Sequence, residues 1–411
     1  MKYYFLFSWR NLWRNKRRTL LATSSIFFAV LLTVLFAALN YGQDDDTMRM
    51  SVSLSTGYLQ IQEKGYWDER SLEKSFEVRD GVLGMVRSFP RITLANPRIE
   101  SVALVSYGTE TRISPVIGID PETENRMTGL KKRIVKGSYL NDSSQGILIA
   151  EGLADRLHLS VGDSIVLFSQ GYQGATAAEQ LAIAGILHFP VPKMNDAMVY
   201  LSLPKAQTFF NANRRVTSIA LMVDDPRKVH AVQSSLSQKL DPDLVLINWE
   251  EMLPEVVQAI QANDAGSLLT FGVFYVVIAF GVFGTIMMMT IERTREFGLL
   301  ISLGMKRGRL FLVTTLEAVL ISMVGAIAGL AVSIPVVFYF HHHPIHIWGD
   351  LAKAYESYGM EPIMSVNADA SLFYSQTIIV FIIALIASLY PLFVIRKLRP
   401  VSALQGRNGK K

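Results

Sequence analysis

The chain has 411 residues, half of them apolar and 18% charged, with a mean hydropathy of +0.28. This balance argues against an ordinary soluble protein and against a protein built only of membrane spans, and it favours spans combined with one large soluble domain. The absence of cysteine excludes disulfides, thiol chemistry and cysteine-based metal sites. The net charge of +5 combines basic short segments with an acidic middle, so it does not indicate nucleic-acid binding.

The N-terminal segment, residues 1–18, mixes aromatic side chains with six basic residues and contains no acid. Its apolar residues Phe5, Trp9, Leu12 and Trp13 recur at helical spacing. This pattern predicts an amphipathic helix on the cytoplasmic membrane surface. A topology signal with tryptophan anchoring at the interface is the alternative, and the two interpretations are compatible.

Four long apolar runs each exceed the roughly 20 residues that a helix needs to cross a bilayer core. They predict four transmembrane helices, over residues 19–41, 266–291, 310–340 and 372–395. The first run could instead be a secretory signal peptide, but its apolar core is longer than the roughly 7–15 residues typical of one.

Basic residues predict the orientation. Residues 1–18, 292–309 and 396–411 together hold 17 basic and 2 acidic residues, whereas residues 42–265 carry a net charge of −6. The loop 341–371 holds one lysine and four acids. By the positive-inside rule, both termini and the 292–309 loop face the cytoplasm, and the acidic segments face outward. The last 16 residues form a basic cytoplasmic tail.

The segment 42–265 is long enough for a core of its own and for two subdomains. Short strands alternate with short helices along it, which predicts an α+β fold. The overall expectation is a multi-span α-helical membrane protein with a large extracytoplasmic α+β domain inserted between the first and second spans. Expected strands are 57–62, 99–107, 114–119, 217–223 and 244–247; residues 147–168 are expected to form strand, helix, Gly-Asp turn and strand; expected helices are 225–240 and 248–264.

Small residues are spaced for close helix packing in the third span, where Gly325 and Gly329 are four residues apart. The second span carries Gly272, Gly281 and Gly284. Packing within one chain is favoured over a dimer contact.

Sequence motifs for common enzymes are missing: there is no phosphate-binding GxxxxGK[ST], no GxSxG and no HExxH. We therefore expect a non-catalytic subunit. The histidines of "HHHPIH" could bind a metal or sense pH. No cysteine or well-spaced carboxylate completes the set, so a polar interfacial loop is favoured and no metal site is predicted. These histidines are His341, His342, His343 and His346.

Glu317 lies inside the third span, near its cytoplasmic end. An ionisable residue in a span is costly and indicates a role. A structural partner on a neighbouring helix is favoured over substrate or proton handling.

The stretch "IERTREFGLLISLGMKRGRLF", residues 291–311, is charged and helix-prone although apolar runs flank it. Glu292 and Arg295 are spaced to support a helix, and Gly304 is placed to end it. Physical chemistry leaves two interpretations open, a simple connector or a docking element for a cytosolic partner.

A family resemblance favours docking. "ERTREFGLLISLGMKRGRLFLVTTLEAVLISMVGAIAGL" closely resembles the signature of the FtsX/MacB/LolC-type ABC permeases, with a glutamate early in the third span. "SLYPLFVIRKLRPVSALQG" (388–406) resembles the close of that family's sequences, and "WRNLWRNKRRTLLATSSIFFAV" resembles its entry to the first span. The resemblance runs across nearly the whole chain in the same order.

The resemblance implies a permease of the inner membrane that pairs with a second permease, a copy or a paralogue, over a cytoplasmic ABC ATPase dimer. ATP and Mg would be bound by the ATPase, and this chain would bind no cofactor. The segment 292–309 would be the coupling helix. Its implied ATPase-coupling residues are Glu292, Arg293, Arg295, Glu296, Gly298 and Gly304.

Two segments resemble the lipoprotein-releasing LolC/LolE branch, "GYLQIQEKGYWDE" (57–69) and "INWEEMLPEVVQAIQAND" (247–264). The expected function is extraction of lipoproteins from the inner membrane for transfer to the outer membrane, with membrane lipids and a periplasmic carrier as further partners. The loop around "HHHPIH" does not match that branch, so two alternatives stay open. One is efflux of drugs, peptides or lipids with a periplasmic adaptor, and the other is FtsX-like transmembrane signalling to a cell-wall hydrolase. Candidate substrate contacts are Ile26, Phe27 and Leu31.

Overall fold

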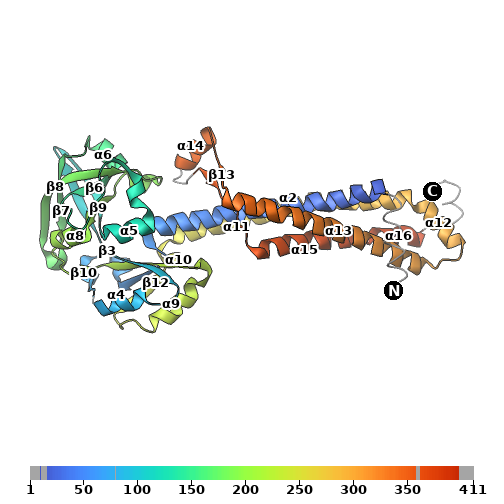
Figure 1. The fold of residues 1–411 in the computed structure, drawn as a ribbon, viewed down its shortest axis with the longest axis horizontal. Helices are drawn as coiled ribbons and strands as arrows, with labels where there is room; N and C mark the ends of the chain where they lie inside the picture. The colour runs from blue at the N-terminus through green and yellow to red at the C-terminus, as the bar shows by residue number, and fades with distance from the viewer. Residues whose placement is uncertain (1–9, 11–15, 79, 358–361, 398–411) are drawn as a thin grey trace. The chain divides into compact units, whose positions relative to one another are not determined.

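The computed structural model describes residues 10, 16–78, 80–357 and 362–397. The expected amphipathic helix 1–18 and the tail 396–411 lie almost entirely outside these residues. The chain divides into two compact units (Figure 1). The helical unit comprises residues 1–45, 261–346 and 363–411, and the sheet unit comprises residues 46–260 and 347–362.

Four helices of the described chain are long and apolar enough to cross a membrane, and they coincide with the four predicted runs. Two of them continue well past the predicted spans, since α2 extends to Ser51 and α11 begins at Pro254. The helices of this set are α2 (Lys16–Ser51), α11 (Pro254–Glu292), α13 (Arg307–His342) and α15 (Ala370–Ala387), and α16 (Tyr390–Lys397) follows the last.

The predicted small-residue face of α13 packs against α2 of the same chain. A Cβ added to Gly325 would lie 2.8 Å from the carbonyl oxygen of Thr23 and 2.9 Å from Cβ of Ile26. A Cβ on Gly329 would lie 2.8 Å from the carbonyl oxygen of Phe27. Only glycine permits this approach. The contact confirms packing within one chain at this face.

The sheet unit is built on a ten-stranded mixed sheet with the order β12-β1-β11-β3-β4-β9-β6-β8-β5, and β7 pairs with β3 and β8 (Figure 1). The bounds are β1 (Leu59–Glu63), β3 (Ile92–Tyr107), β4 (Glu110–Ile119), β5 (Ile134–Gly137), β6 (Ile147–Ala150), β7 (Ser164–Gln170), β8 (Thr176–Leu187), β9 (Val199–Ser202), β11 (Ser218–Val223) and β12 (Leu244–Asn248).

Strand β3 connects the two halves of this sheet. Residues before its middle pair with β11, and residues near its end pair with β7. Separate apolar cores lie on the two halves, one around Ile61 and Leu221 and the other around Ile149 and Leu201. Each core is closed by short helices that follow the strands.

Those helices and the remaining short elements occupy the connections. They are α3 (Tyr66–Glu69), α4 (Asp80–Arg87), α5 (Pro121–Thr128), α6 (Glu151–Arg156), α7 (Pro192–Asn195), α8 (Leu203–Phe209), α9 (Val229–Ser237), α10 (Trp249–Met252), α14 (Asp350–Ser357), with β2 (Phe76–Glu77), β10 (Arg215–Val216), β13 (Ile345–His346) and β14 (Ile363–Met364).

All the predicted strands are present, but the single helix expected over 248–264 is wrong. Asn248 and Glu251 form a capping box at the start of α10, which ends after one turn. Leu253 then adopts φ −125° and ψ 59°, and α11 begins at Pro254. Proline lacks an N–H and restricts the residue before it, so it begins a helix and cannot continue one.

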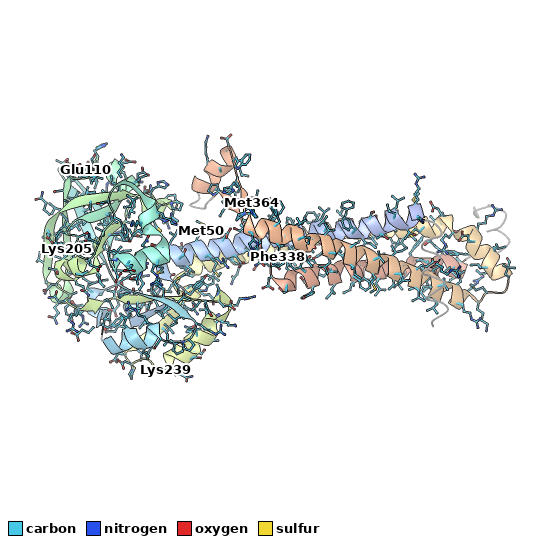
Figure 2. All side chains as sticks on the ribbon, in the orientation of Figure 1. Met50, Glu110, Lys205, Lys239, Phe338 and Met364 are labelled. Carbon is cyan, nitrogen blue, oxygen red and sulfur yellow. The ribbon has the colours of Figure 1, made fainter. Side chains whose placement is uncertain are left out.

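The long helix α2 ends in an uncommon element inside the sheet unit. Met50, labelled in Figure 2, lies in its last turn, and the chain continues as a π-helix, η1 (Val52–Thr56). The buried Arg98 of β3 donates to the carbonyl oxygen of Ser55 in η1. The same guanidinium donates to both carboxylate oxygens of Glu124 in α5, at 2.8 and 2.7 Å. One buried cation therefore ties η1 to the sheet and to α5.

The charges around Arg98 perturb one another. Burial lowers the pKa of the Arg98 guanidinium, but the carboxylates of Glu124 and Glu100 outweigh that effect and raise it overall. Burial raises the pKa of Glu100, and the positive charges of Arg98 and Arg70 only partly oppose it. Folding therefore makes the ionised carboxylate of Glu100 less favourable than it is in water, without reversing its charge balance with Arg70.

We predict that Gly325→Ala destabilises the purified protein in detergent micelles by about 1–3 kcal/mol, because its Cβ meets the backbone of α2. Gly272→Ala is the matched control, since nothing lies within 4 Å of its added Cβ. The control should be neutral or more stable, because alanine favours helix over glycine. Denaturant titration gives both values, and equal stability of the two variants would contradict the packing.

We also predict a pH-dependent effect of Glu100→Gln. The folded protein holds the proton of Glu100 more tightly than the unfolded chain does, so the cost of burying the ionised carboxylate is present at neutral pH. That cost disappears as pH falls toward the ordinary pKa of 4.5. Glu100→Gln should therefore raise the unfolding temperature at pH 7.5, with a smaller gain at pH 5. A gain that does not change with pH would contradict the raised pKa.

Candidate functional site

The charged stretch between α11 and α13 forms a short helix, α12 (Thr294–Ser302), separated from α11 by one residue. That residue, Arg293, has φ −93° and ψ 1°, which interrupts the helical path. Its carbonyl oxygen accepts a hydrogen bond of 2.9 Å from the N–H of Phe297, so α12 begins directly after this residue.

Gly304 ends α12 as the sequence predicts. It has φ +94°, its N–H donates to Ile301, and the N–H of Met305 donates to Leu300, both at 3.0 Å. This pair of bonds is the Schellman arrangement that closes a helix at a left-handed residue. Lys306 then leads directly into α13.

A buried ion pair joins the start of α12 to α13. Arg293 is 6% exposed and Glu317 3% exposed, and Nη1 of the arginine donates to the carboxylate of the glutamate. Nε of Arg293 also lies 3.2 Å from Glu296. A cavity of about 30 Å³ beside the pair is lined by Thr290 and Thr314 and has room for a water molecule.

The apolar side of α12 is fixed by Phe297, which is fully buried. It packs in one cluster with Leu310 of α13 and Ile395 of α16. The α12 segment is therefore held against α13 and α16 by one aromatic side chain and one ion pair.

The six residues expected to contact an ATPase fall into two groups. Arg293 and Gly298 are buried. Glu292, Arg295, Glu296 and Gly304 are exposed.

Two exposed leucines beside these residues were not among the predicted coupling residues. Leu299 is 51% and Leu303 76% exposed. They stand four residues apart and extend the row that begins with Arg295, and this spacing was a usable signal. We call Glu292, Arg295, Glu296, Leu299 and Leu303 the α12 outer face.

The three candidate substrate contacts on α2 are not equivalent. Ile26 is buried against Gly325, whereas Phe27 and Leu31 are half-buried. The exposed side of α2 instead carries Phe28 and Leu32, whose side chains are 55% and 57% exposed.

Helix α11 packs less tightly than the other three apolar helices. In its most apolar window 11% of the residues are buried, compared with 33–39% in the others. Two hydrogen bonds tie one end of it to α2, from Ser267 to Asn40 at 2.8 Å and from Asn263 to Asp44 at 2.7 Å. Large apolar side chains exposed along α11 include Leu268, Leu269, Val273, Val277 and Phe280.

The histidine-rich stretch is engaged with backbone oxygens. Nδ1 of His341 lies 2.6 Å from the carbonyl oxygen of Val366, and Nδ1 of His342 and His343 lie 2.8 and 3.1 Å from carbonyls one turn earlier. Across the described part of the chain, no three histidine or acidic side chains, His346 included, are grouped for a metal ion.

Comparison with known families gives two matches. The description "FtsX-like permease C-terminal" fits residues 268–400, and "MacB-like periplasmic core domain" fits residues 19–239.

Several known proteins are similar in sequence to this chain. LolE of Haemophilus influenzae, a lipoprotein-releasing system transmembrane protein, is 21% identical over 60% of this chain and 60% of its own length. The macrolide export protein MacB of Campylobacter jejuni is 24% identical over 82% of this chain and 54% of its own length. The pyoverdine export protein PvdT of Pseudomonas fluorescens is 24% identical over 80% of this chain and 50% of its own length. The chain thus spans 50–60% of the length of these relatives.

Among solved structures, the periplasmic region of MacB from Actinobacillus actinomycetemcomitans aligns with 50% of this chain and 94% of its own, at 14% identity and a TM-score of 0.36.

For the buried pair we predict that Glu317→Gln or Arg293→Gln alone destabilises the protein by roughly 3–5 kcal/mol, because each leaves a buried charge without its partner. The combined Arg293→Met and Glu317→Leu variant should recover most of the loss. Lys353→Met is the control, since it opens the exposed pair with Asp350, and it should leave stability unchanged. Denaturant titration in micelles measures all four. Additive losses in the combined variant would show that the two residues do not act as a pair.

Proposed function

Because this chain belongs to the FtsX/MacB/LolC-type permease family, we propose that it couples ATP hydrolysis by a separate cytoplasmic ATPase to the extraction of lipoproteins from the inner membrane. The family places it in a membrane, with a large periplasmic domain. Both termini would lie in the cytoplasm, with ATP and Mg held by the ATPase. Four spans per permease and two permeases per assembly belong to the same proposal.

The observation that carries the coupling role is the Arg293–Glu317 pair. It lies at the junction of α11 and α12 and connects this junction to α13. When nucleotide binding draws the ATPase subunits together, the docked α12 is displaced with them. The ion pair and the Phe297 cluster pass that displacement to α11 and α13, so the step in this chain is mechanical.

The surface that docks is the α12 outer face. It combines acidic and basic side chains with two exposed leucines, a mixture suited to a cleft with an apolar floor and a charged rim. Arg293 and Gly298 lie behind this surface. Their proposed role is to fix the direction of α12, and the ATPase would not touch them.

The loosely packed α11 suits a route for acyl chains. A helix that exposes a row of large apolar side chains must face lipid, a second permease or an apolar cargo. If a lipid-anchored cargo enters laterally, this face of α11 contacts lipid first and the apolar part of the cargo afterwards. The names of the LolE and LolC relatives support a lipoprotein cargo.

Efflux of a smaller compound is the second candidate function. The export proteins MacB and PvdT align with 80–82% of this chain, whereas LolE aligns with 60%. The same coupling device serves both functions, so the cargo alone distinguishes them.

We predict that Leu303→Ser lowers the amount of ATPase that co-purifies with the chain by about tenfold, because an exposed apolar contact at a docking surface is typically worth 1–2 kcal/mol. Leu351→Ser is the control, as that leucine is 58% exposed on α14, outside the docking segment. Quantitative mass spectrometry of the purified complexes measures both, and equal ATPase recovery would remove α12 as the docking element.

Native purification of the unmodified chain tests the cargo. We expect an ATPase and acylated lipoproteins in the same preparation. An ATPase with a periplasmic adaptor and no lipoprotein would favour efflux, and a preparation without any ATPase would contradict the coupling role.

A further inference from the structure

The sheet unit contains a cavity of about 240 Å³ that is lined by both polar and apolar side chains. Three neighbouring strands form its floor. Glu100 of β3 is paired across the sheet with Ile117 of β4, and Ile117 is paired with Tyr200 of β9. Side chains at paired positions lie on the same face, so these three stand in one row beneath the cavity.

Two polar groups in this row lack hydrogen-bond partners among the described residues. The nearest cation to the Glu100 carboxylate is Nη1 of Arg98 at 3.9 Å, which is too far for a hydrogen bond. Tyr200 is only 3% exposed, and its ring stacks on Phe189. No hydrogen bond to its hydroxyl is found in the described chain. Burial raises the pKa of Tyr200, so the hydroxyl keeps its proton and can donate it.

The charges around the cavity cancel. Arg98 is neutralised by the bidentate Glu124, and Arg70 and Glu100 supply one further charge of each sign. Arg70 lies over the ring of Trp67, at 3.5 Å from its centroid. A ligand with a net charge gains little from such a balanced site, which favours an uncharged ligand with its own hydrogen-bonding groups.

Methionine supplies much of the apolar lining. Met194, Met198 and Met252 all line the cavity. Methionine side chains are flexible and polarisable, and they adapt to apolar groups of different shape. The volume is below the roughly 300–1,000 Å³ of sites for drug-sized ligands. It suits one or two residues of a longer chain.

We propose that this cavity binds an extended, uncharged segment of the cargo polypeptide, with a peptide N–H donating to Glu100, Tyr200 donating to a peptide carbonyl, and an apolar side chain against the methionines. This proposal rests on the proposed transport of lipoproteins and names where their polypeptide part is held. An acyl chain alone would leave Glu100 and Tyr200 without partners, which is unfavourable in a buried site.

The cavity is lined by residues that adjoin the helices α2 and α11 in the chain. Leu54 and Ser55 of η1 line it, and so does Leu253, the residue before α11. These residues are continuous in the chain with the helices α2 and α11. A bound peptide thus contacts the ends of both segments that lead to the predicted first and second spans.

The test is isothermal titration of the full chain in lipid nanodiscs, without ATPase, with a blocked five-residue peptide of alternating serine and leucine as the probe. Tyr200→Phe should weaken binding about threefold to tenfold, because it removes one neutral hydrogen bond. Glu100→Gln should weaken it about threefold to tenfold, because the amide oxygen of glutamine is a weaker acceptor than the ionised carboxylate. Both substitutions preserve shape.

Matched controls are Tyr107→Phe and Glu110→Gln, at exposed positions at the end of β3 and the start of β4; Glu110 is labelled in Figure 2. They should bind the peptide like the unmodified chain. Peptide binding no stronger than to empty nanodiscs, or equal binding by all four variants, would overturn the proposal. Binding of dodecanoate without binding of the peptide would overturn it in favour of an acyl-chain site. The titration contains no ATPase, so absence of peptide binding would not bear on the coupling role. Conversely, loss of ATPase co-purification would not change the measured peptide affinity.

Discussion

Arg293 and Glu317 hold each other out of water at the place where two helices meet a third. Each charge would be strongly unfavourable alone in that position, so the pair fixes the start of α12 to α13 more tightly than an exposed contact could. The buried ring of Phe297 and the left-handed Gly304 then determine where α12 runs and where it stops. The α12 outer face is the consequence of these constraints.

A second buried arginine organises the sheet unit in a comparable way. Arg98 joins η1 to α5 through Ser55 and Glu124, while a capping box starts α10 next to the first residue of α11. Both ends of the main chain segment of the sheet unit are therefore held by hydrogen bonds within that unit.

The sequence indicated much of this arrangement. Apolar length located the four long helices, and local patterns located seven strands of the large sheet but not β5, β8 or β9. Glycine spacing predicted close packing of α13 within the chain, without identifying α2 as its partner. The sequence predicted a partner for Glu317 but did not identify which residue that partner is. Arg293 looks like any other charge of its segment, and only its meeting with Glu317, 24 positions away, makes it internal. The row formed by Glu100, Ile117 and Tyr200 depends on a parallel pairing of β4 with β9 that no local pattern specifies.

The most direct test of the coupling role exchanges the two charges in the reconstituted complex with its ATPase, and measures cargo released per ATP hydrolysed. Arg293→Glu and Glu317→Arg, made singly, should hydrolyse ATP with little release. Made together, they should restore a large part of the release, since the attraction between α12 and α13 is re-formed with the signs reversed. Normal release by either single variant would show that force reaches the membrane helices by another route.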